Sequence, residues 1–171
     1  MIKKLLLVSI TFILLTGDSK YLMAQAHERG NVFTNVGIIW GMRGYNYSDI
    51  SSNVLANLSM DYALSEGVSL GAQYGKSLFN RENGSFDNSM SLYAVRLGFH
   101  LSSSDYFDPY INLSLGTMTN NYNSYYGIVY DNYTVLGVNL GTRYMFKKSF
   151  GIFGDVGIGM GLISFGLVDK F

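Results

Sequence analysis

The residues with the greatest potential for chemistry are two histidines, in a chain of 171 residues that has no cysteine. The lack of cysteine excludes thiolate catalysis and cysteine-ligated zinc. His100 is followed by serines at 102–104 and by Asp105, residue types that together can form a Ser/His/Asp set. The sequence favours a simpler interpretation, in which His100 is a polar residue at the end of a strand. His27 is predicted to lie in a flexible N-terminal segment.

A glycine-rich segment at residues 157–161 has the spacing of a phosphate-binding loop. It lacks the following helix and the lysine that such a loop requires, so glycines in a hairpin or against a crowded interior explain it better. We therefore expect no cofactor, no metal ion and no catalytic residue. The basic and acidic residues number 12 each, which argues against a nucleic-acid partner, because such a partner requires a basic surface.

Four charged residues stand out because each lies well inside a segment of alternating polarity, on the phase of small polar residues. They are Asp61, Arg96, Arg143 and Asp155. Two are acidic and two are basic, as expected where charges must pair inside a confined space. We expect ion pairs among them that hold the structure together and block a pore. A pair between Arg143 and Asp155, on adjacent segments, is one candidate.

The segments that carry these charges alternate with a period of two. In residues 53–62 the apolar phase holds Val54, Ala56, Leu58, Met60 and Tyr62. No stretch of the chain after residue 26 keeps a helical period for long enough to predict a helix. The alternation predicts eight β-strands, at residues 32–40, 53–62, 68–75, 93–100, 111–116, 136–144, 150–158 and 162–171.

The composition of the polar phase indicates what each face of these strands meets. This phase is mostly Gly, Ser and Asn, whereas a strand face in water is usually rich in Lys, Glu and Thr. Only 14% of the chain is charged, against about 25% in a typical soluble domain. We therefore expect the apolar phase to face lipid and the small polar phase to fill a lumen. The predicted fold is an all-β, transmembrane, antiparallel up-and-down β-barrel of eight strands.

The predicted connections alternate in length. The first, third and fifth, at residues 42–52, 76–89 and 119–132, are long, and the second, fourth and sixth, at 65–67, 102–108 and 147–149, are shorter. Long extracellular loops alternating with short periplasmic turns are typical of outer-membrane barrels. The seventh, at Gly159, is very short and breaks this pattern. Within the fifth connection, Tyr122, Asn123, Tyr125 and Tyr126 have the composition of a recognition loop.

The first 26 residues have the layout of a secretory signal peptide. Lys3 and Lys4 precede a largely apolar run at residues 5–15, and Ala24 and Ala26 offer small residues for cleavage. The run is too short for a membrane helix, which needs about 20 residues. We expect residues 1–26 to be a signal and residues 27–171 to be a single exported barrel domain.

Three segments resemble the small OmpA/OmpX-type eight-stranded outer-membrane barrels, namely residues 108–116, 137–144 and 151–171. Phe171, with Leu167, Phe165 and Ile163 at alternating positions before it, is similar to the C-terminal strand signature of that family, from which Asp169 departs. The resemblance implies a location in the bacterial outer membrane. It also implies that periplasmic chaperones and the outer-membrane assembly machinery, which reads the terminal aromatic residue, are partners beside the lipid bilayer. It carries no catalytic motif.

The function favoured by these features is a structural or surface-interaction role, with a lumen plugged by side chains and any extracellular ligand bound by the loops. Three alternatives stay open. A small porin would conduct ions, a lipid-directed hydrolase would act on membrane lipid, and a soluble periplasmic barrel would bind an apolar ligand. We expect the protein not to be an enzyme.

Overall fold

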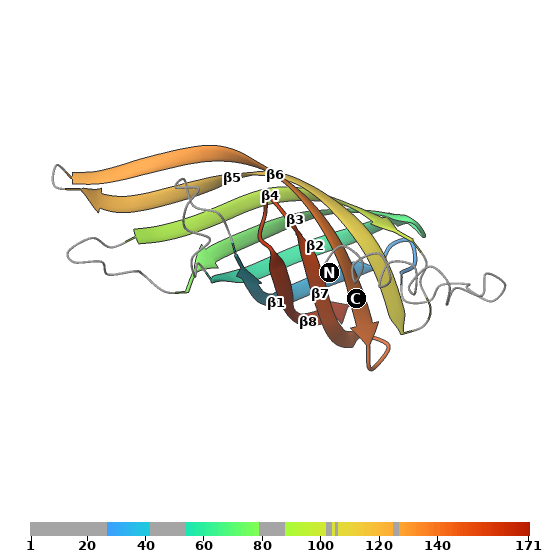
Figure 1. Cartoon of the computed structure of the whole chain (residues 1–171). Helices are drawn as coiled ribbons and strands as arrows, with labels where there is room; N and C mark the ends of the chain where they lie inside the picture. Colours follow the sequence, from blue (N-terminus) through green and yellow to red (C-terminus); the bar gives the residue numbers. More distant parts are fainter. Residues whose placement is uncertain (1–26, 42–53, 79–87, 102–103, 105, 125–126) are drawn as a thin grey trace, which may run out of the picture.

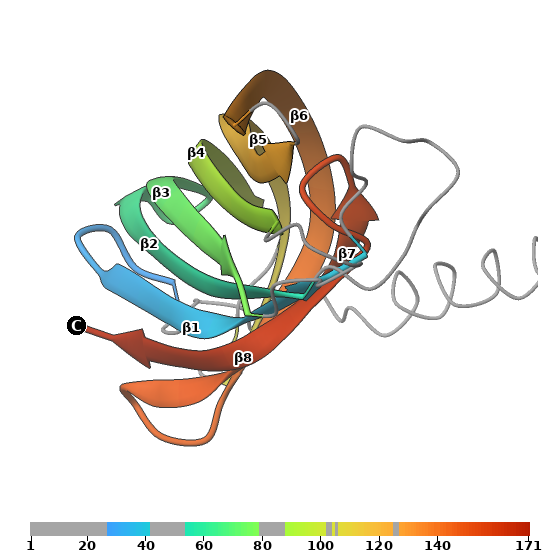
Figure 2. The same ribbon diagram turned by 90° about the vertical axis from the view of Figure 1, so that its left-hand side faces the viewer.

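The computed structural model describes residues 27–41, 54–78, 88–101, 104, 106–124 and 127–171. These residues form eight strands in one closed antiparallel barrel, in which each strand pairs with its neighbours in sequence and β8 pairs with β1 (Figures 1 and 2). The predicted fold class is confirmed. The strands are β1 (Val32–Trp40), β2 (Leu55–Ser65), β3 (Val68–Ser77), β4 (Asn88–His100), β5 (Phe107–Ser124), β6 (Gly127–Met145), β7 (Phe150–Ile158) and β8 (Ile163–Lys170).

No helix in the described part of the chain is long and apolar enough to cross a membrane. Residues 1–26 lie outside the described residues, so the signal peptide stays a prediction.

The two phases of the alternating sequence face opposite sides of the barrel wall. In β2, Asn57, Ser59 and Asp61 are buried in the lumen, whereas Leu58 and Met60 are exposed on the outer face. Elsewhere on the outer face, Leu136 is 70% exposed. The predicted direction of the two phases is confirmed, and it is the reverse of a water-soluble barrel, whose apolar side chains converge on the axis.

Glycines on the inner face make room for the larger side chains of the lumen. A Cβ at Gly141 would overlap the carboxylate of Asp155 and the ring of Tyr110, and one at Gly71 would overlap the carboxylate of Asp61. The glycine-rich segment 157–161 covers the last two residues of β7 and the first three of its connection to β8. Gly159 and Gly161 have φ angles of 92° and 135°, which side chains other than glycine rarely adopt.

The β5–β6 hairpin differs from the predicted connection at residues 119–132, which was wrong. These residues continue the two strands, with Thr119 opposite Asn132 and Ser124 opposite Gly127, and the hairpin reaches beyond the other strands in Figure 1. The segment contains four Tyr together with Ile128 and Val129, residue types that favour strands. Because a two-stranded ladder satisfies its own backbone groups along the line of pairing, the hairpin can continue beyond the neighbouring strands.

The two ends of the barrel are distinguished by their connections. Residues 41–54 and 78–87 join strands at one end, which we call the long-connection end, and residues 66–67, 101–106 and 146–149 join strands at the other, the short-turn end. The lumen is filled in three layers. An apolar cluster of Ile39, Leu55, Met90, Leu92, Ala94, Met118 and Met160 lies at the long-connection end.

The second and third layers complete the filling of the lumen. A polar belt follows in the middle, made of the residues Asn35, Asn57, Ser59, Asp61, Arg96, Asn112, Ser114, Asp155 and Ser164. The short-turn end holds a second apolar cluster of Phe33, Ala63, Met145, Phe153 and Val168. Arg143 packs on Phe33 of this cluster, so the short-turn end combines apolar and charged side chains.

Candidate functional site

Arg143 is the centre of the charged cluster and ties opposite walls of the barrel together. Its Nη2 donates to Asp61 Oδ2 at 2.7 Å, which joins β6 to β2, and its Nη1 donates to Asp108 Oδ2 at 3.1 Å. The guanidinium carbon lies 4.3 Å from the ring centre of Phe33 and 4.8 Å from that of Tyr110. Two carboxylates and two aromatic faces thus replace the water that this buried cation has lost.

Arg96 joins the same cluster from β4. Its Nη1 donates to Ser59 Oγ at 2.9 Å, and its Nε lies 3.6 Å from Asp61 Oδ1. Asp61 also accepts a hydrogen bond from Asn35 Nδ2 at 3.1 Å. Asp61 is therefore shared by two arginines, and the three residues form one network rather than separate pairs.

The fourth predicted charge, Asp155, does not pair with Arg143, so that suggested pair was wrong. Asp155 accepts hydrogen bonds from Tyr110 Oη at 2.6 Å and from Ser164 Oγ at 2.7 Å. The register explains the difference, because Asp155 lies opposite Gly141 whereas Arg143 lies directly opposite Asp108. Arg143 is therefore drawn toward the short-turn end by Asp108.

His100 lies at the end of β4 with its side chain in the lumen. Its Nδ1 is 2.7 Å from Asp108 Oδ1, and its Nε2 is hydrogen-bonded to Ser69 Oγ at 3.0 Å. The predicted partners at 102, 103 and 105 lie outside the described residues. The Ser/His/Asp set that the structure assembles instead comes from β3, β4 and β5.

This Ser69–His100–Asp108 chain has the hydrogen-bond order of a hydrolase triad. Ser69 is only 2% exposed, and a Cβ at Gly98 would overlap its hydroxyl. A nucleophile packed this tightly leaves no room for a scissile bond. In this arrangement the three residues form a buried structural network.

His27 is not a residue of a flexible segment, so that prediction was wrong. It is fully buried and stacks on His100, with ring centres 3.4 Å apart, and on Phe33, with ring centres 5.4 Å apart. Its Nε2 is hydrogen-bonded to the carbonyl of Ser65 at 3.1 Å. Burial, with the nearby His100 as a second cause, lowers the pKa of His27 to about 4. The imidazole is therefore neutral at neutral pH.

One group of side chains in the described segments is arranged so that it could hold a metal ion. His27, His100 and Asp108 are all buried, and one potential ligand atom from each lies within 4.8 Å of the others. Sequence patterns do not indicate this group, because His27 lies 73 positions before His100 and outside every alternating segment. No resident cofactor is implied by the fold.

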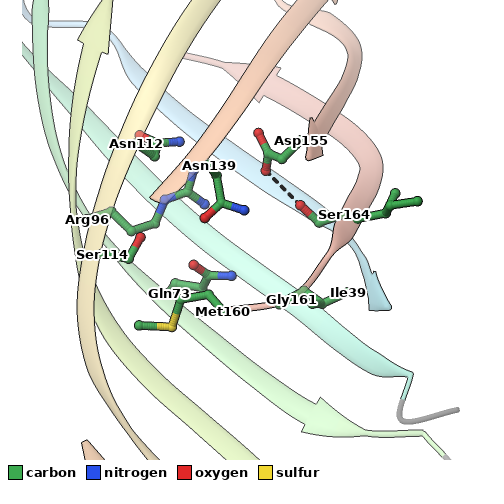
Figure 3. A pocket seen from close by; sticks show the side chains of 11 residues that line it. Ile39, Gln73, Arg96, Asn112, Ser114, Asn139, Asp155, Met160, Gly161 and Ser164 are labelled. Atoms are coloured by element: carbon green, nitrogen blue, oxygen red, sulfur yellow. Dashed lines mark hydrogen bonds between the residues drawn. The ribbon is translucent and has the colours of Figure 1, made fainter. Parts of the chain in front are cut away.

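One cavity among the described residues lies in the lumen, and it is small. It is lined mainly by polar residues of the central belt, and Arg96 and Asn139 point into it (Figure 3). Its volume is about 10 Å³, counted as space open to the centre of a water molecule. That is room for about one water, which is too little for an organic ligand.

The predicted surface residues are placed as follows. Tyr122 and Asn123 belong to β5, while Tyr125 and Tyr126 lie outside the described residues. Phe171 is exposed, and its backbone exchanges two hydrogen bonds with Val32 on β1, of 3.1 and 2.9 Å. Phe171 therefore extends the ladder that closes the barrel.

Sequence reasoning missed Asp108 and Tyr110, which join the network from the start of β5. Asp108 was predicted to lie in a turn, but it shares the inward phase of Asn112 and Ser114. Extending that alternation by four residues toward the N-terminus would have found both Asp108 and Tyr110. No local signal marks His27.

Solved structures with this fold come from several bacteria, while no protein-family model and no curated sequence matches the chain. The N-terminal β-barrel domain of Pseudomonas aeruginosa OprF aligns with a TM-score of 0.59 and 15% identity, over 84% of this chain and 98% of that one. Ail of Yersinia pestis aligns with a TM-score of 0.52 and 16% identity, over 84% and 99%. Neisserial surface protein A aligns with a TM-score of 0.55 and 11% identity, over 82% and 91%. The chain therefore has the fold of the eight-stranded outer-membrane β-barrels of the OmpA/OmpX type.

Proposed function

We propose that this protein is a bacterial outer-membrane barrel that recognises an extracellular protein through the β5–β6 hairpin, while its lumen stays closed. The observation that carries the proposal is the length of the hairpin. β6 runs from Gly127 to Met145, but its pairing with β7 begins only at Val138. Within the described residues, the first half of β6 therefore has a ladder partner only on the β5 side.

An unpaired strand edge presents backbone N–H and C=O groups that another chain can pair with. Recognition by strand addition uses such an edge for affinity, and side chains near it for specificity. The hairpin projects from the long-connection end, which we place outside the cell because long loops are extracellular in this type of barrel. Its free edge is then accessible to a partner.

The charge of the hairpin indicates which class of partner it can bind. One of the solved Ail structures is a complex with a heparin analogue, sucrose octasulfate. Residues 117–137 of the present chain contain Asp131 and no lysine or arginine. A polysulfated ligand needs cations, so this hairpin is suited to an extended polypeptide segment instead.

The proposed membrane location is supported by the outer face, whose leucines, valines and aromatic rings would be costly to expose to water.

The proposed closure of the lumen is supported by its filling, in which the apolar cluster at the long-connection end and the Arg143 network leave room for about one water molecule. A porin is disfavoured for the same reason. In a planar bilayer we expect no ion-conducting steps.

Binding is tested with cells that display either the natural protein or one of two variants. The first variant replaces residues 120–131 with a two-residue Asn-Gly turn, and so removes the outer part of the free edge, residues 127–131. The second changes Tyr122, Tyr125 and Tyr126 to Ser and keeps the backbone. We expect the shortened hairpin to reduce adherence to a protein-coated surface at least tenfold, and the second variant to reduce it less. Equal adherence by the natural protein and the shortened variant would refute hairpin recognition.

The hydrolase alternative keeps one supporting observation, the Ser69–His100–Asp108 chain. It is tested by incubating the folded barrel with phospholipid and lipopolysaccharide and following the release of fatty acid. We expect no release. Release that disappears in the Ser69→Ala variant would establish the hydrolase in place of the closed barrel.

A further inference from the structure

Three residues from three different elements meet at the short-turn end of the lumen. His27 precedes β1, His100 ends β4 and Asp108 begins β5. All three are buried, and one potential ligand atom from each lies within 4.8 Å of the others. Two imidazoles and one carboxylate make up a donor set that binds divalent transition metals, of which zinc is the most common in proteins.

In each of the three residues, the polar atom that points away from the group already has a hydrogen-bond partner. His27 Nε2 contacts the Ser65 carbonyl at 3.1 Å, and His100 Nε2 contacts Ser69 Oγ at 3.0 Å. Asp108 Oδ2 accepts from Arg143 Nη1 at 3.1 Å. Metal-binding histidines and carboxylates are oriented in this way, because a hydrogen bond on the far atom fixes the ring and directs the near atom at the ion.

Of the three near atoms, one lacks a hydrogen-bond partner and the other two are paired with each other. His27 Nδ1 is buried and has no hydrogen-bond partner. Because Nε2 faces a carbonyl and must donate to it, Nδ1 carries the lone pair. A buried lone pair without a partner is costly, and a metal ion would satisfy it. The other two near atoms, His100 Nδ1 and Asp108 Oδ1, lie 2.7 Å apart.

The charge of the lumen also favours a cation. Among the described residues, the buried carboxylates of the lumen are Asp61, Asp108 and Asp155, and the buried guanidiniums are those of Arg96 and Arg143. These groups alone leave one negative charge in excess. Asp108 shares Arg143 with Asp61, so a divalent ion beside Asp108 would offset the remaining negative charge of the group.

We propose that His27, His100 and Asp108 bind a zinc-class divalent metal ion, with water as a fourth ligand. The ligand atoms of a tetrahedral zinc lie about 3.3 Å apart, from bonds of about 2.0–2.1 Å. The His100–Asp108 contact therefore opens slightly on binding, and the other separations close. The stacked imidazoles, now 16° from parallel, must incline to each other. Binding therefore requires the His27 ring to give up part of its stacking on His100, while the β4 and β5 ladders hold His100 and Asp108 in place. The ion then fastens the segment before β1 to β4 and β5.

The test uses the folded barrel in detergent, purified without a histidine tag and stripped with a chelator. Zn²⁺ binding is measured by calorimetry, and Co²⁺ is used as a spectroscopic probe of the ligand geometry. We expect one ion per chain with an affinity in the micromolar range or tighter, and visible Co²⁺ bands typical of four-coordinate nitrogen and oxygen ligation. No binding, or more than one weak ion per chain, would overturn the proposal.

Three variants locate the ion. His27→Ala should abolish stoichiometric binding, and Ser69→Ala, which removes the support behind His100, should weaken it about 10- to 100-fold. Asp155→Asn is the matched control, a buried lumen carboxylate outside the group, and should bind as the natural protein does. Heat-modified mobility on a gel shows whether each variant has folded. If His27→Ala fails to fold, His27→Gln takes its place. Unchanged affinity in a folded His27 variant would place the ion elsewhere.

Discussion

The two ends of the lumen are closed by different kinds of interaction. At the long-connection end, side chains such as Leu92 and Met118 are fully buried in an apolar cluster. At the short-turn end, Arg143 is held by two carboxylates and two aromatic rings. The apolar end is stabilised by the area it removes from water. The charged end depends on geometry, because each of its buried charges is acceptable only while its partners are in place.

This difference determines how each end responds to damage. An apolar cluster loses only the contacts of the group removed, together with the cost of any cavity left behind. A charged network loses more, because removing one member leaves the others buried without compensation. The following substitutions test the comparison from the largest expected effect to the smallest.

The largest effect is expected for Arg143→Met, which leaves Asp61 and Asp108 facing each other without the cation that joins them. We expect a loss of about 3–5 kcal/mol in the free energy of unfolding, measured by urea titration of the barrel in lipid or detergent. Adding Asp61→Asn to this variant should recover part of the loss. An unchanged unfolding midpoint would show that Arg143 is hydrated.

A smaller loss is expected at the apolar end. Leu92→Ala should lower the free energy of unfolding by about 2–3 kcal/mol, because it leaves a cavity beside Met118 and Met160. Leu92→Met keeps the volume and should cost less than about 1.5 kcal/mol. If Leu92→Ala costs more than Arg143→Met, the order of the two ends is reversed.

Tyr110→Phe removes a single hydrogen bond to a charged acceptor, since Tyr110 Oη donates to Asp155 Oδ1 at 2.6 Å. We expect a loss of about 1.5–2 kcal/mol with the barrel otherwise intact. Ser164 still donates to the other oxygen of Asp155. The same titration measures the loss, and a loss close to that of Arg143→Met would mean that Tyr110 supports the whole network.

The smallest effect is expected for Gln73→Leu, at a half-buried residue that contacts the polar belt. Gln73 donates to Asn57 Oδ1 at 2.9 Å, and losing this neutral hydrogen bond should cost about 0.5–1.5 kcal/mol. Planar-bilayer recordings of this variant should stay free of conductance steps. Conductance would show that Gln73 contributes to the closure of the lumen.

The barrel could be predicted from the sequence because a strand has only two faces. One alternation places Leu58 outside and Asp61 inside, and eight such segments in succession specify the order of the ladders. The inward direction of all four predicted charges followed from the same rule. The long β5–β6 hairpin did not, because Asn and Tyr suit both an extended ladder and a loop, and the alternation does not distinguish them.

The partners of each charge could not be predicted, since they depend on how the ring closes. Arg143 and Asp61 are separated by 82 positions in the chain, and they meet only because β2 and β6 lie on opposite walls of the closed cylinder. His27 joins the site through an irregular segment that has no periodicity at all. Periodicity predicts which way a side chain points, but not what it meets across the lumen.

The seam between β1 and β8 has a consequence for how the molecule assembles. It joins Phe33 to Lys170 and Trp40 to Ile163, so its formation closes a loop that contains every other strand. Loop-closure entropy grows with the length enclosed, and structures dominated by distant contacts fold slowly. Of the eight ladders, this one closes the longest loop and so has the highest entropic barrier to formation. Until it forms, β1 and β8 each have an unpaired edge that a strand of another molecule can pair with. The rate at which β1 pairs with β8 therefore determines how soon the barrel is closed. It also determines how long the two unpaired edges are exposed to aggregation.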